Sequence, residues 1–288
     1  MAKAIVGVIG GSGVYHLPGL TDLREEQIAT PWGDPSDSLR FGRVGQTQAV
    51  FLARHGRGHR FSPSTINYRA NIDALKRVGV TDIIALSACG SFHRDLYPGM
   101  FVMIDQIEDR TYRRQTSFFG DGCVAHVSMA HPIAPLLRRR LVAAAQAENV
   151  PCRDSGTYVC IEGPQFSSLA ESLGFQARGA DVIGMTGATE AKLAREAEIS
   201  YASIAMVTDY DCWREGHDSV TIEEIIAVMH KNAENAAKVV KAAVAAMPHE
   251  RTCACGSAAQ YAVITQADLI PAEIKEKLGL LFGKYLGW

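Results

Sequence analysis

Short, continuously apolar runs alternate along the chain with longer stretches in which apolar residues recur at helical spacing. Runs of the first kind predict buried strands at residues 4–9, 48–53, 82–88, 100–104, 157–161, 181–185 and 199–208. Stretches of the second kind predict helices at residues 67–78, 131–146, 167–173, 189–196, 221–246 and 271–285. This alternation predicts an α/β fold whose mostly parallel sheet is covered by helices on both faces.

Two of the predicted helices have clear end signals. Thr221 and Glu224 form a Thr-x-x-Glu capping box that opens the helix at 221–246, and Gly79 follows the helix at 67–78. The chain shows no linker, low-complexity tract or internal repeat. For 288 residues, the simplest organisation is one domain over residues 1–288, with residues 247–288 packed on it as a C-terminal extension.

Composition narrows the class of protein further. Lys plus Arg number 29 and Asp plus Glu 31, a net charge of −2 that argues against a nucleic-acid-binding protein. No stretch reaches the roughly 18 apolar residues that a membrane helix needs. The seven cysteines are an odd number in a chain that is not short, so they are not the framework of a small secreted domain. We therefore expect a soluble cytoplasmic protein.

The cysteines fall into two groups. Cys89, Cys160 and Cys212 lie in or beside apolar runs and are expected to be small buried side chains. Cys253 and Cys255 lie in a loop-like stretch, where they could form a local disulfide, a metal half-site or neither. No second Cys/His pair at finger spacing accompanies them, which disfavours a zinc site.

Polar residues gather where the predicted strands end. Ser12, Arg54, Ser87, Thr186 and Asp209 each lie at or just after the end of an apolar run. In open α/β sheets ligands bind beyond the carboxyl ends of the strands, so we expect a site there, although polar residues also begin ordinary loops. The glycine turn at residues 10–13 suits an anion or a plain tight turn, and the Arg54 guanidinium suits a bidentate phosphate contact.

Asp209 and Asp211 lie two residues apart after the last predicted strand. If the extended geometry continues, both carboxyl groups point to the same side. Two neighbouring carboxyl groups raise one of the two pKa values, and a protonated carboxyl can act as an acid. The alternative is a solvated acidic turn.

Eight segments match one known family of enzymes. They are residues 9–13, 52–56, 67–71, 87–91, 104–111, 161–167, 179–183 and 201–213. In these segments, which run over most of residues 4–246, the chain resembles the trimeric nucleoside phosphorylases. The block at 201–213, Tyr-Ala-Ser-Ile-Ala-Met-Val-Thr-Asp-Tyr-Asp-Cys-Trp, is the longest and the most specific.

The resemblance replaces the simple parallel sheet with a three-layer α/β/α sandwich whose central sheet is mixed and partly barrel-like. It implies a homotrimer, or a dimer of trimers, in which phosphate attacks C1′ of a nucleoside and releases a purine. Inorganic phosphate is then a co-substrate, and no metal or organic cofactor is expected. A hydrolase on the same scaffold and a nucleoside-binding protein without catalysis are the competing hypotheses.

The resemblance also assigns roles to individual residues. The phosphate shell is Ser12, Arg54, His55, Ser87, Ala88 and Thr186. The nucleoside shell is Phe166, Ser167, Ile183, Met185, Ile222 and Ile225. Asp209 is expected to protonate purine N7 and Asp211 to lie near the 6-amino group. His126 and Ile264 fall where the family lends a histidine and an apolar residue from the neighbouring subunit.

Three positions favour an adenine nucleoside with an apolar 5′ group. Ser167 stands where the 6-oxopurine enzymes of this family carry Glu, Asp209 where they carry Asn, and Ile222 where they carry His. An apolar pocket accepts a methylthio group and leaves a hydroxyl poorly paired. We expect 5′-methylthioadenosine as substrate, with 5′-deoxyadenosine second. Gly184 stands where such enzymes often have Asn, and 5′-methylthioinosine or a general purine nucleoside is the alternative.

Overall fold

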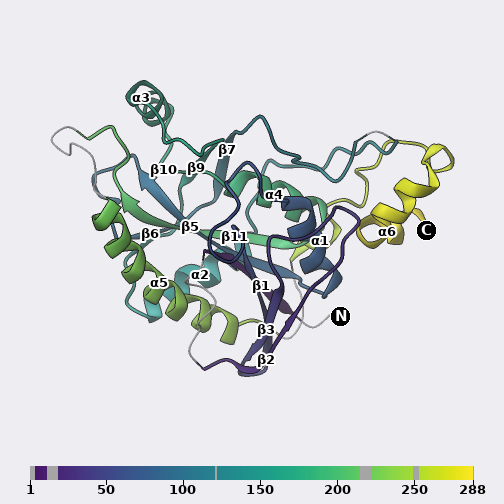
Figure 1. The fold of residues 1–288 in the computed structure, drawn as a ribbon, viewed down its shortest axis with the longest axis horizontal. Helices are drawn as coiled ribbons and strands as arrows, with labels where there is room; N and C mark the ends of the chain where they lie inside the picture. The colour runs from purple at the N-terminus through teal and green to yellow at the C-terminus, as the bar shows by residue number, and fades with distance from the viewer. Residues whose placement is uncertain (1–3, 12–18, 121, 215–221, 249–252, 288) are drawn as a thin grey trace.

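The computed structural model describes residues 4–11, 19–120, 122–214, 222–248 and 253–287. Within these ranges one sheet of eleven strands is flanked by helices (Figure 1). The strands are β1 (Ile5–Gly10), β2 (Thr21–Glu26), β3 (Leu39–Val44), β4 (Thr47–Ala53), β5 (Asp82–Ser91), β6 (Phe101–Met103), β7 (Gln106–Arg110), β8 (Cys152–Arg153), β9 (Thr157–Ile161), β10 (Val182–Gly184) and β11 (Ser200–Asp209). The helices are α1 (Tyr68–Arg77), α2 (Pro135–Ala147), α3 (Leu169–Ala177), α4 (Gly187–Glu196), α5 (Ile222–Ala245) and α6 (Ala272–Leu286).

The sheet is mixed, as the family resemblance predicts. Its main path runs β2-β3-β4-β1-β5-β10-β9-β7, and β11, β6 and β8 branch from β5. Six of the ten strand pairs among the described residues are parallel, and the other four, β2–β3, β3–β4, β5–β10 and β6–β11, are antiparallel. The alternation of elements thus predicts the parallel majority but not these four pairs. Across the described residues the two ends of the path, β2 and β7, do not pair, so the sheet does not close into a barrel.

The apolar pattern misses four strands, and three of them are polar or very short. β2 has the sequence TDLREE and all six of its residues are exposed. β7 has the sequence QIEDR and lies at the end of the sheet, and β8 spans only two residues. A strand without a buried face leaves no apolar period in the sequence, which explains the omission of β2. The fourth, β3, is mostly buried but has the sequence LRFGRV, in which two arginines and a glycine interrupt the apolar run.

Helices cover both faces of the sheet. α2 and α5 pack together against β11 on one side, and α1 and α4 pack together on the other (Figure 1). α3 begins two residues later than predicted because Ser168 and Glu171 form a capping box there. The described part of α5 begins at Ile222, so the capping box predicted at Thr221 lies outside the described residues.

Residues near the C-terminus contact the body of the protein through Glu198, which is fully buried in the turn between α4 and β11. The Tyr285 hydroxyl donates to Glu198 Oε1 at 2.6 Å, and the Ala259 N–H donates to the same oxygen at 3.0 Å. Lys284 forms an ion pair with the other oxygen. One carboxylate therefore anchors both α6 and the segment before it.

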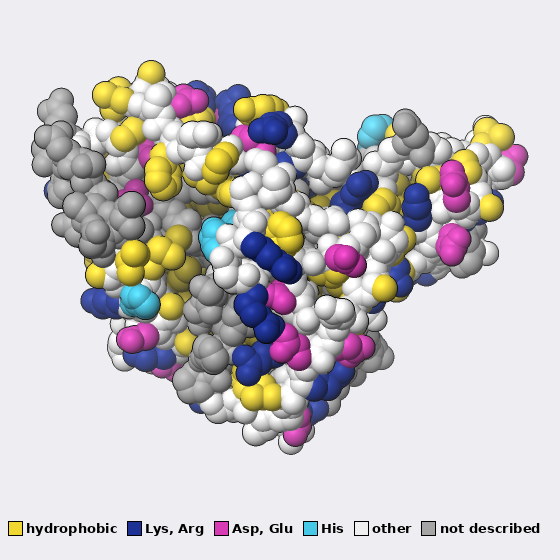
Figure 2. Space-filling model, in the orientation of Figure 1, with side chains coloured by type: hydrophobic (Ala, Val, Ile, Leu, Met, Phe, Trp, Pro, Cys, Tyr) yellow, Lys and Arg dark blue, Asp and Glu magenta, His cyan; other side chains and the backbone are white. Residues whose placement is uncertain are grey.

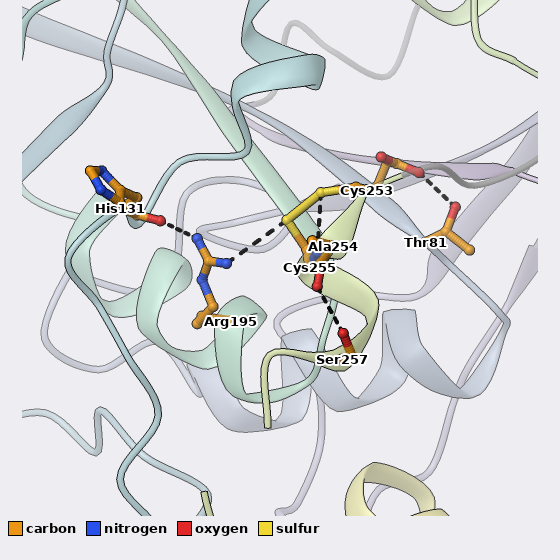
Figure 3. The surroundings of a disulfide bond; sticks show 8 residues. Thr81, His131, Arg195, Cys253, Ala254, Cys255 and Ser257 are labelled. Carbon is orange, nitrogen blue, oxygen red and sulfur yellow. Dashed lines mark hydrogen bonds between the residues drawn. A yellow bond between two sulfur atoms is a disulfide. The ribbon is translucent and has the colours of Figure 1, made fainter. Parts of the chain in front are cut away.

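The cysteines follow the prediction with one exception. Cys89 and Cys160 are buried, whereas Cys212 is exposed because β11 ends at Asp209 and the chain turns away from the core. Cys253 and Cys255 are joined by a disulfide at the start of a short 3₁₀ helix, η2 (Ala254–Ser257). Figure 3 shows Arg195 beside it, with Nη1 3.9 Å from Cys255 Sγ.

In the part of the chain that the structure describes, no helix has the length and apolar character needed to span a bilayer.

Candidate active site

The site lies where one edge of β5 stops pairing with one strand and begins to pair with another. Asp82–Ala85 pair with β1 and Gly90–Ser91 with β10, while β11 follows the opposite edge. Among the described residues, no strand pairs with positions 86–89 on the first edge. Ser87 there is buried and Ala88 is exposed in an otherwise buried strand. The change of partner therefore opens a gap in the sheet beside these two predicted phosphate residues.

Arg54 lies at the end of β4, next to this gap, and is almost fully buried. Its Nε and Nη2 donate to the two oxygens of Glu190 at 2.5 and 3.0 Å, and its Nη1 donates to the Leu86 carbonyl at 2.7 Å. Arginine has five N–H donors, so about two remain without a partner among the described residues. Glu190 thus fixes the guanidinium in a position where those two donors are available to an anion.

The N-terminus of α4 adjoins Arg54, because Glu190 lies one turn into this helix. Thr186 is the residue before the helix, and its side chain does not cap it. The Thr186 Oγ1 atom is buried and has no hydrogen-bond partner within the described ranges. Free N–H groups and the helix dipole at such an end favour an anion, and the orphaned hydroxyl would gain a partner from one.

His55 is held as a neutral ring. Its Nδ1 lies 2.8 Å from the Phe61 carbonyl, and its ring stacks on that of His59 at 4.1 Å between centroids. Burial and the charge of Arg54 lower the pKa of His55 to about 4. Because a carbonyl only accepts, Nδ1 carries the proton of the neutral ring and Nε2 is left as an acceptor.

The two aspartates meet against Gly90, at the end of β5. A side-chain carbon at Gly90 would lie 3.0 Å from Asp209 Oδ1, 3.1 Å from Ile183 and 3.2 Å from Asp211. A larger residue would require these neighbours to shift by a few tenths of an ångström. Ile183, Asp209 and Asp211 are therefore brought together, as the sequence predicts.

The chain does not stay extended between the aspartates, so the expectation of two side chains on one face of a continuing strand is wrong. Asp211 has a positive φ of 53°, and its N–H donates to Asp209 Oδ1 at 2.8 Å. Burial raises the pKa of Asp211, and the negative charge of Asp209 adds to the rise, although the hydrogen bond from Ser167 opposes it. The expected upward shift in one of the two pKa values is thus found at Asp211.

Ser167 and Phe166 lie on the other side of Asp211. The Ser167 hydroxyl lies 3.1 Å from Asp211 Oδ2, and Phe166 is 79% exposed. Both line a cavity of about 470 Å³, which also touches Tyr112 and α3. Hydrophobic side chains gather on the surface over α3 (Figure 2). The lining of this cavity includes none of Arg54, Ser87 and Thr186, so it adjoins only the part of the site near Asp211.

Met185 is fixed by a second buried arginine. The Arg114 guanidinium donates to the Met185 carbonyl, to Glu162 Oε1 at 3.2 Å and to the Glu162 carbonyl at 2.6 Å. A side-chain carbon at Gly163 would come within 2.5 Å of Met185 Sδ, so the turn after β9 also presses against this methionine. Arg114 therefore holds together the turns that carry Phe166 and Met185.

Some predicted residues cannot be placed in the site. Ser12 lies outside the described residues, as do the side chains of Ile222 and Ile225. His126 and Ile264 lie on one ribbon beside α6, because Ala125 pairs with Val263 and the Ile264 N–H donates to the Val124 carbonyl. Neither joins the other site residues within this chain.

Four residues of the site were not predicted, namely Glu190, Tyr158, Arg114 and Glu162. Glu190 lies four residues after Thr186, one helical turn into α4, and that spacing was the available signal. Glu162 lies inside the Ile-Glu-Gly-Pro-Gln-Phe-Ser motif that carried the resemblance. Nothing in the sequence pairs Arg114 or Tyr158 with its contacts.

The family model of the phosphorylase superfamily matches residues 5–245. The chain belongs to this superfamily. It is 54% identical over 289 aligned residues to the S-methyl-5′-thioadenosine phosphorylase of Bradyrhizobium diazoefficiens, covering 99% of both chains. It is 51% identical to the protein of the same name from Cereibacter sphaeroides, again covering 99% of both.

Solved structures agree with these relatives. The crystal structure of a methylthioadenosine phosphorylase from an Antarctic soil metagenomic library has a TM-score of 0.93 and 44% identity, and the match covers 98% of this chain and 99% of that one. A methylthioadenosine phosphorylase from Schistosoma mansoni in complex with adenine has a TM-score of 0.81 and 39% identity. That match covers 84% of this chain and 91% of the other.

Proposed function

We propose that the protein catalyses the phosphorolysis of 5′-methylthioadenosine to adenine and 5-methylthioribose 1-phosphate. The observation that carries the proposal is the anion end of the site. Buried Arg54 has about two N–H donors without a partner among the described residues. They lie beside the Thr186 hydroxyl, which also has no partner there, and the uncapped N-terminus of α4. A water-using hydrolase has no need of these features. The names of the relatives support the choice of substrate.

The reaction follows from placing phosphate at this end. A phosphate oxygen forms a bond to C1′ while the bond from C1′ to purine N9 breaks, and the electron pair leaves with the purine. The phosphate charge stabilises the positive charge that develops on the ribose. A proton delivered to N7 from Asp209 neutralises the leaving purine, and general acid catalysis of this kind contributes about 10²–10⁴-fold. Phosphate is the co-substrate, and the proposal includes no metal or organic cofactor.

Adenine is favoured by the contact between Ser167 and Asp211. A carboxylate at Asp211 accepts a hydrogen bond from the 6-amino group of adenine, whereas the 6-oxo group of hypoxanthine has no proton to give. We propose 5′-deoxyadenosine as a second substrate because its 5′ methyl group is also apolar. The reaction would serve purine and methionine salvage in the cytoplasm.

We propose that the protein works as a homotrimer or a dimer of trimers. Ile264 is 62% exposed and Tyr261 is 90% exposed, and both lie on the ribbon that carries His126. Phe166 is similarly exposed at the cavity beside α3. Docking the ribbon of one subunit at the cavity of the next would cover these surfaces and deliver His126 and Ile264 to the neighbouring site.

The deciding experiment measures adenine release from 5′-methylthioadenosine with and without phosphate. We expect release only with phosphate; release in its absence identifies a hydrolase, and none in either case refutes the proposal. Parallel rates on 5′-methylthioinosine, adenosine and inosine test the substrate choice. We expect 5′-methylthioadenosine to have the highest kcat/KM.

Asp209→Ala tests the acid. Because the substitution removes the group that protonates N7, kcat should fall at least about a hundredfold. Asp209→Asn is the matched control, since its amide can still donate to N7 but cannot transfer a proton. Near-native turnover of Asp209→Ala removes Asp209 from this role.

A further inference from the structure

Tyr158 is a fully buried residue of β9 whose hydroxyl lies at the start of α4. The Thr186 N–H donates to the Tyr158 hydroxyl at 3.4 Å. This phenol therefore holds the backbone of a residue that we place beside phosphate.

The chain makes room for this ring by omitting two side chains. A side-chain carbon at Gly184 would lie 2.8 Å from Tyr158 Cζ and closer still to the hydroxyl oxygen. A side-chain carbon at Gly187 would lie 3.2 Å from Tyr158 Cε1. Gly184 and Gly187 flank Met185 and Thr186, so the backbone that carries these two site residues is fitted closely to the tyrosine ring.

The direction of this hydrogen bond follows from the groups involved. A backbone N–H can only donate, so the Tyr158 oxygen accepts from Thr186. Burial raises the pKa of Tyr158, so the acceptor is a neutral phenol.

We propose that Tyr158 is a positioning residue for phosphate, which fixes the Thr186 backbone without touching the phosphate itself. The inference rests on the proposed phosphorolysis, since it needs phosphate at Thr186. It also accounts for Gly184, the position at which the sequence departs from the pattern of the family. Any side chain at that position would displace the Tyr158 hydroxyl.

Tyr158→Phe tests the role of the hydroxyl, because it keeps the ring and removes one oxygen. We expect KM for phosphate to rise about tenfold, since the buried Thr186 N–H loses its acceptor. KM for 5′-methylthioadenosine at saturating phosphate should change less than about twofold. A purely structural role would change both constants together or neither, and either result overturns the proposal.

Tyr285→Phe is the matched control. Its hydroxyl also donates to a buried acceptor, Glu198, but that contact anchors the C-terminal segment. We expect both KM values of this variant to stay close to those of the unmodified protein. A rise in its phosphate KM equal to that of Tyr158→Phe shows that loss of any such hydroxyl weakens phosphate binding, and overturns the proposal.

Gly184→Ala provides a second route that does not remove the hydroxyl. The added methyl group must displace Tyr158, so we expect a loss of phosphate affinity larger than that of Tyr158→Phe. In the double variant Tyr158→Phe/Gly184→Ala, the hydroxyl oxygen nearest to the added methyl group is absent. Part of the phosphate affinity should therefore return. Gly184→Ala with unchanged phosphate affinity, or without any recovery in the double variant, contradicts the fit between Gly184 and Tyr158.

Calorimetric titration with inorganic phosphate alone separates this inference from the proposed function. Weaker phosphate binding by Tyr158→Phe supports the positioning role even if adenine release fails. Equal binding by the two proteins overturns the role, whether or not the unmodified protein is a phosphorylase.

Discussion

Two buried Arg–Glu pairs lie on either side of Thr186. They differ in how many N–H donors the arginine keeps without a protein acceptor. Arg54 and Glu190 are 4% and 2% exposed, and Arg114 and Glu162 are 1% and 6% exposed. Burial is thus the same. Arg54 makes three hydrogen bonds, two of them to its partner, and keeps donors in reserve. Arg114 spreads its donors over Glu162, Met185 and other acceptors of the protein.

The difference teaches how a buried ion pair becomes part of a binding site. Ion pairs of this kind contribute little net stability, because desolvation of the charges opposes their attraction. Arg114, whose donors are used by the protein, positions backbone turns. Arg54 is held by Glu190 at an angle that leaves donors at the gap in β5, so the same pairing creates a site for an anion.

Removing the Arg54 pair should have the largest effect. In Arg54→Gln/Glu190→Gln both charges disappear together, so no buried charge is left without a partner. We expect kcat/KM for phosphate to fall by about 10³-fold or more, because the donors that hold the anion are lost. Steady-state kinetics measures this, with circular dichroism to confirm folding. Glu190→Gln alone is the control, and activity above a tenth of normal in the double variant breaks the comparison.

Removing Arg114 should reduce the stability of the protein more than its activity. Arg114→Gln leaves Glu162 charged and buried without its cation, which should lower the free energy of unfolding by about 3–5 kcal/mol. The fraction that remains folded should keep kcat/KM within about tenfold, because Arg114 does not touch phosphate. Urea unfolding and kinetics on the same sample separate the two effects. A loss of activity as large as that of the Arg54 pair would erase the distinction.

Two carboxyl groups extend the comparison to pH. Burial by itself favours a higher pKa for Glu162, but hydrogen bonds from Ser64 and backbone N–H groups, together with the charge of Arg114, lower that pKa from 4.5 to about 2. Burial raises the pKa of Glu196 from 4.5 to about 7, despite its hydrogen bonds to Phe118 and Ser117. A buried carboxyl with an arginine partner and one without are thus shifted in opposite directions.

Their effects on stability should therefore have opposite signs, and these are the smallest changes expected. The stability supplied by Glu162 is present above about pH 4.5 and is lost as pH falls through about 2. That supplied by Glu196 is present below about pH 4.5 and is lost as pH rises through about 7. Urea unfolding of Glu162→Gln and Glu196→Gln across this range, each compared with the unmodified protein, measures both. Differences that change in the same direction with pH would show that the arginine is not what separates the two groups.

The positions of the site residues were predictable because they follow from one-dimensional signals. Arg54, Thr186 and Asp209 all lie where an apolar run ends, and the carboxyl end of a strand is where such a fold binds ligands. The prediction was wrong at Cys212 because an apolar run does not show the turn at Asp211, whose positive φ ends the strand.

The partners of these residues were not predictable from the same signals. Glu190 is 136 positions from Arg54, and a glutamate in a helix gives no sign that it will meet a buried arginine. The neutral state of His55 depends on burial and on Arg54, and both come from the fold. The Gly184 departure was visible in the sequence, but only the contact with Tyr158 gives it a physical reason.

β2, the strand at one end of the sheet, bears on how the protein behaves at high concentration. An outer strand offers unpaired backbone groups to a passing chain, and flat apolar outer strands promote aggregation. β2 has the sequence TDLREE, so four of its six residues are charged. Basic and acidic side chains are interspersed over this part of the surface (Figure 2). β2 has no apolar period, so the sequence pattern does not predict it. The same polar sequence disfavours pairing between the outer strands of separate molecules.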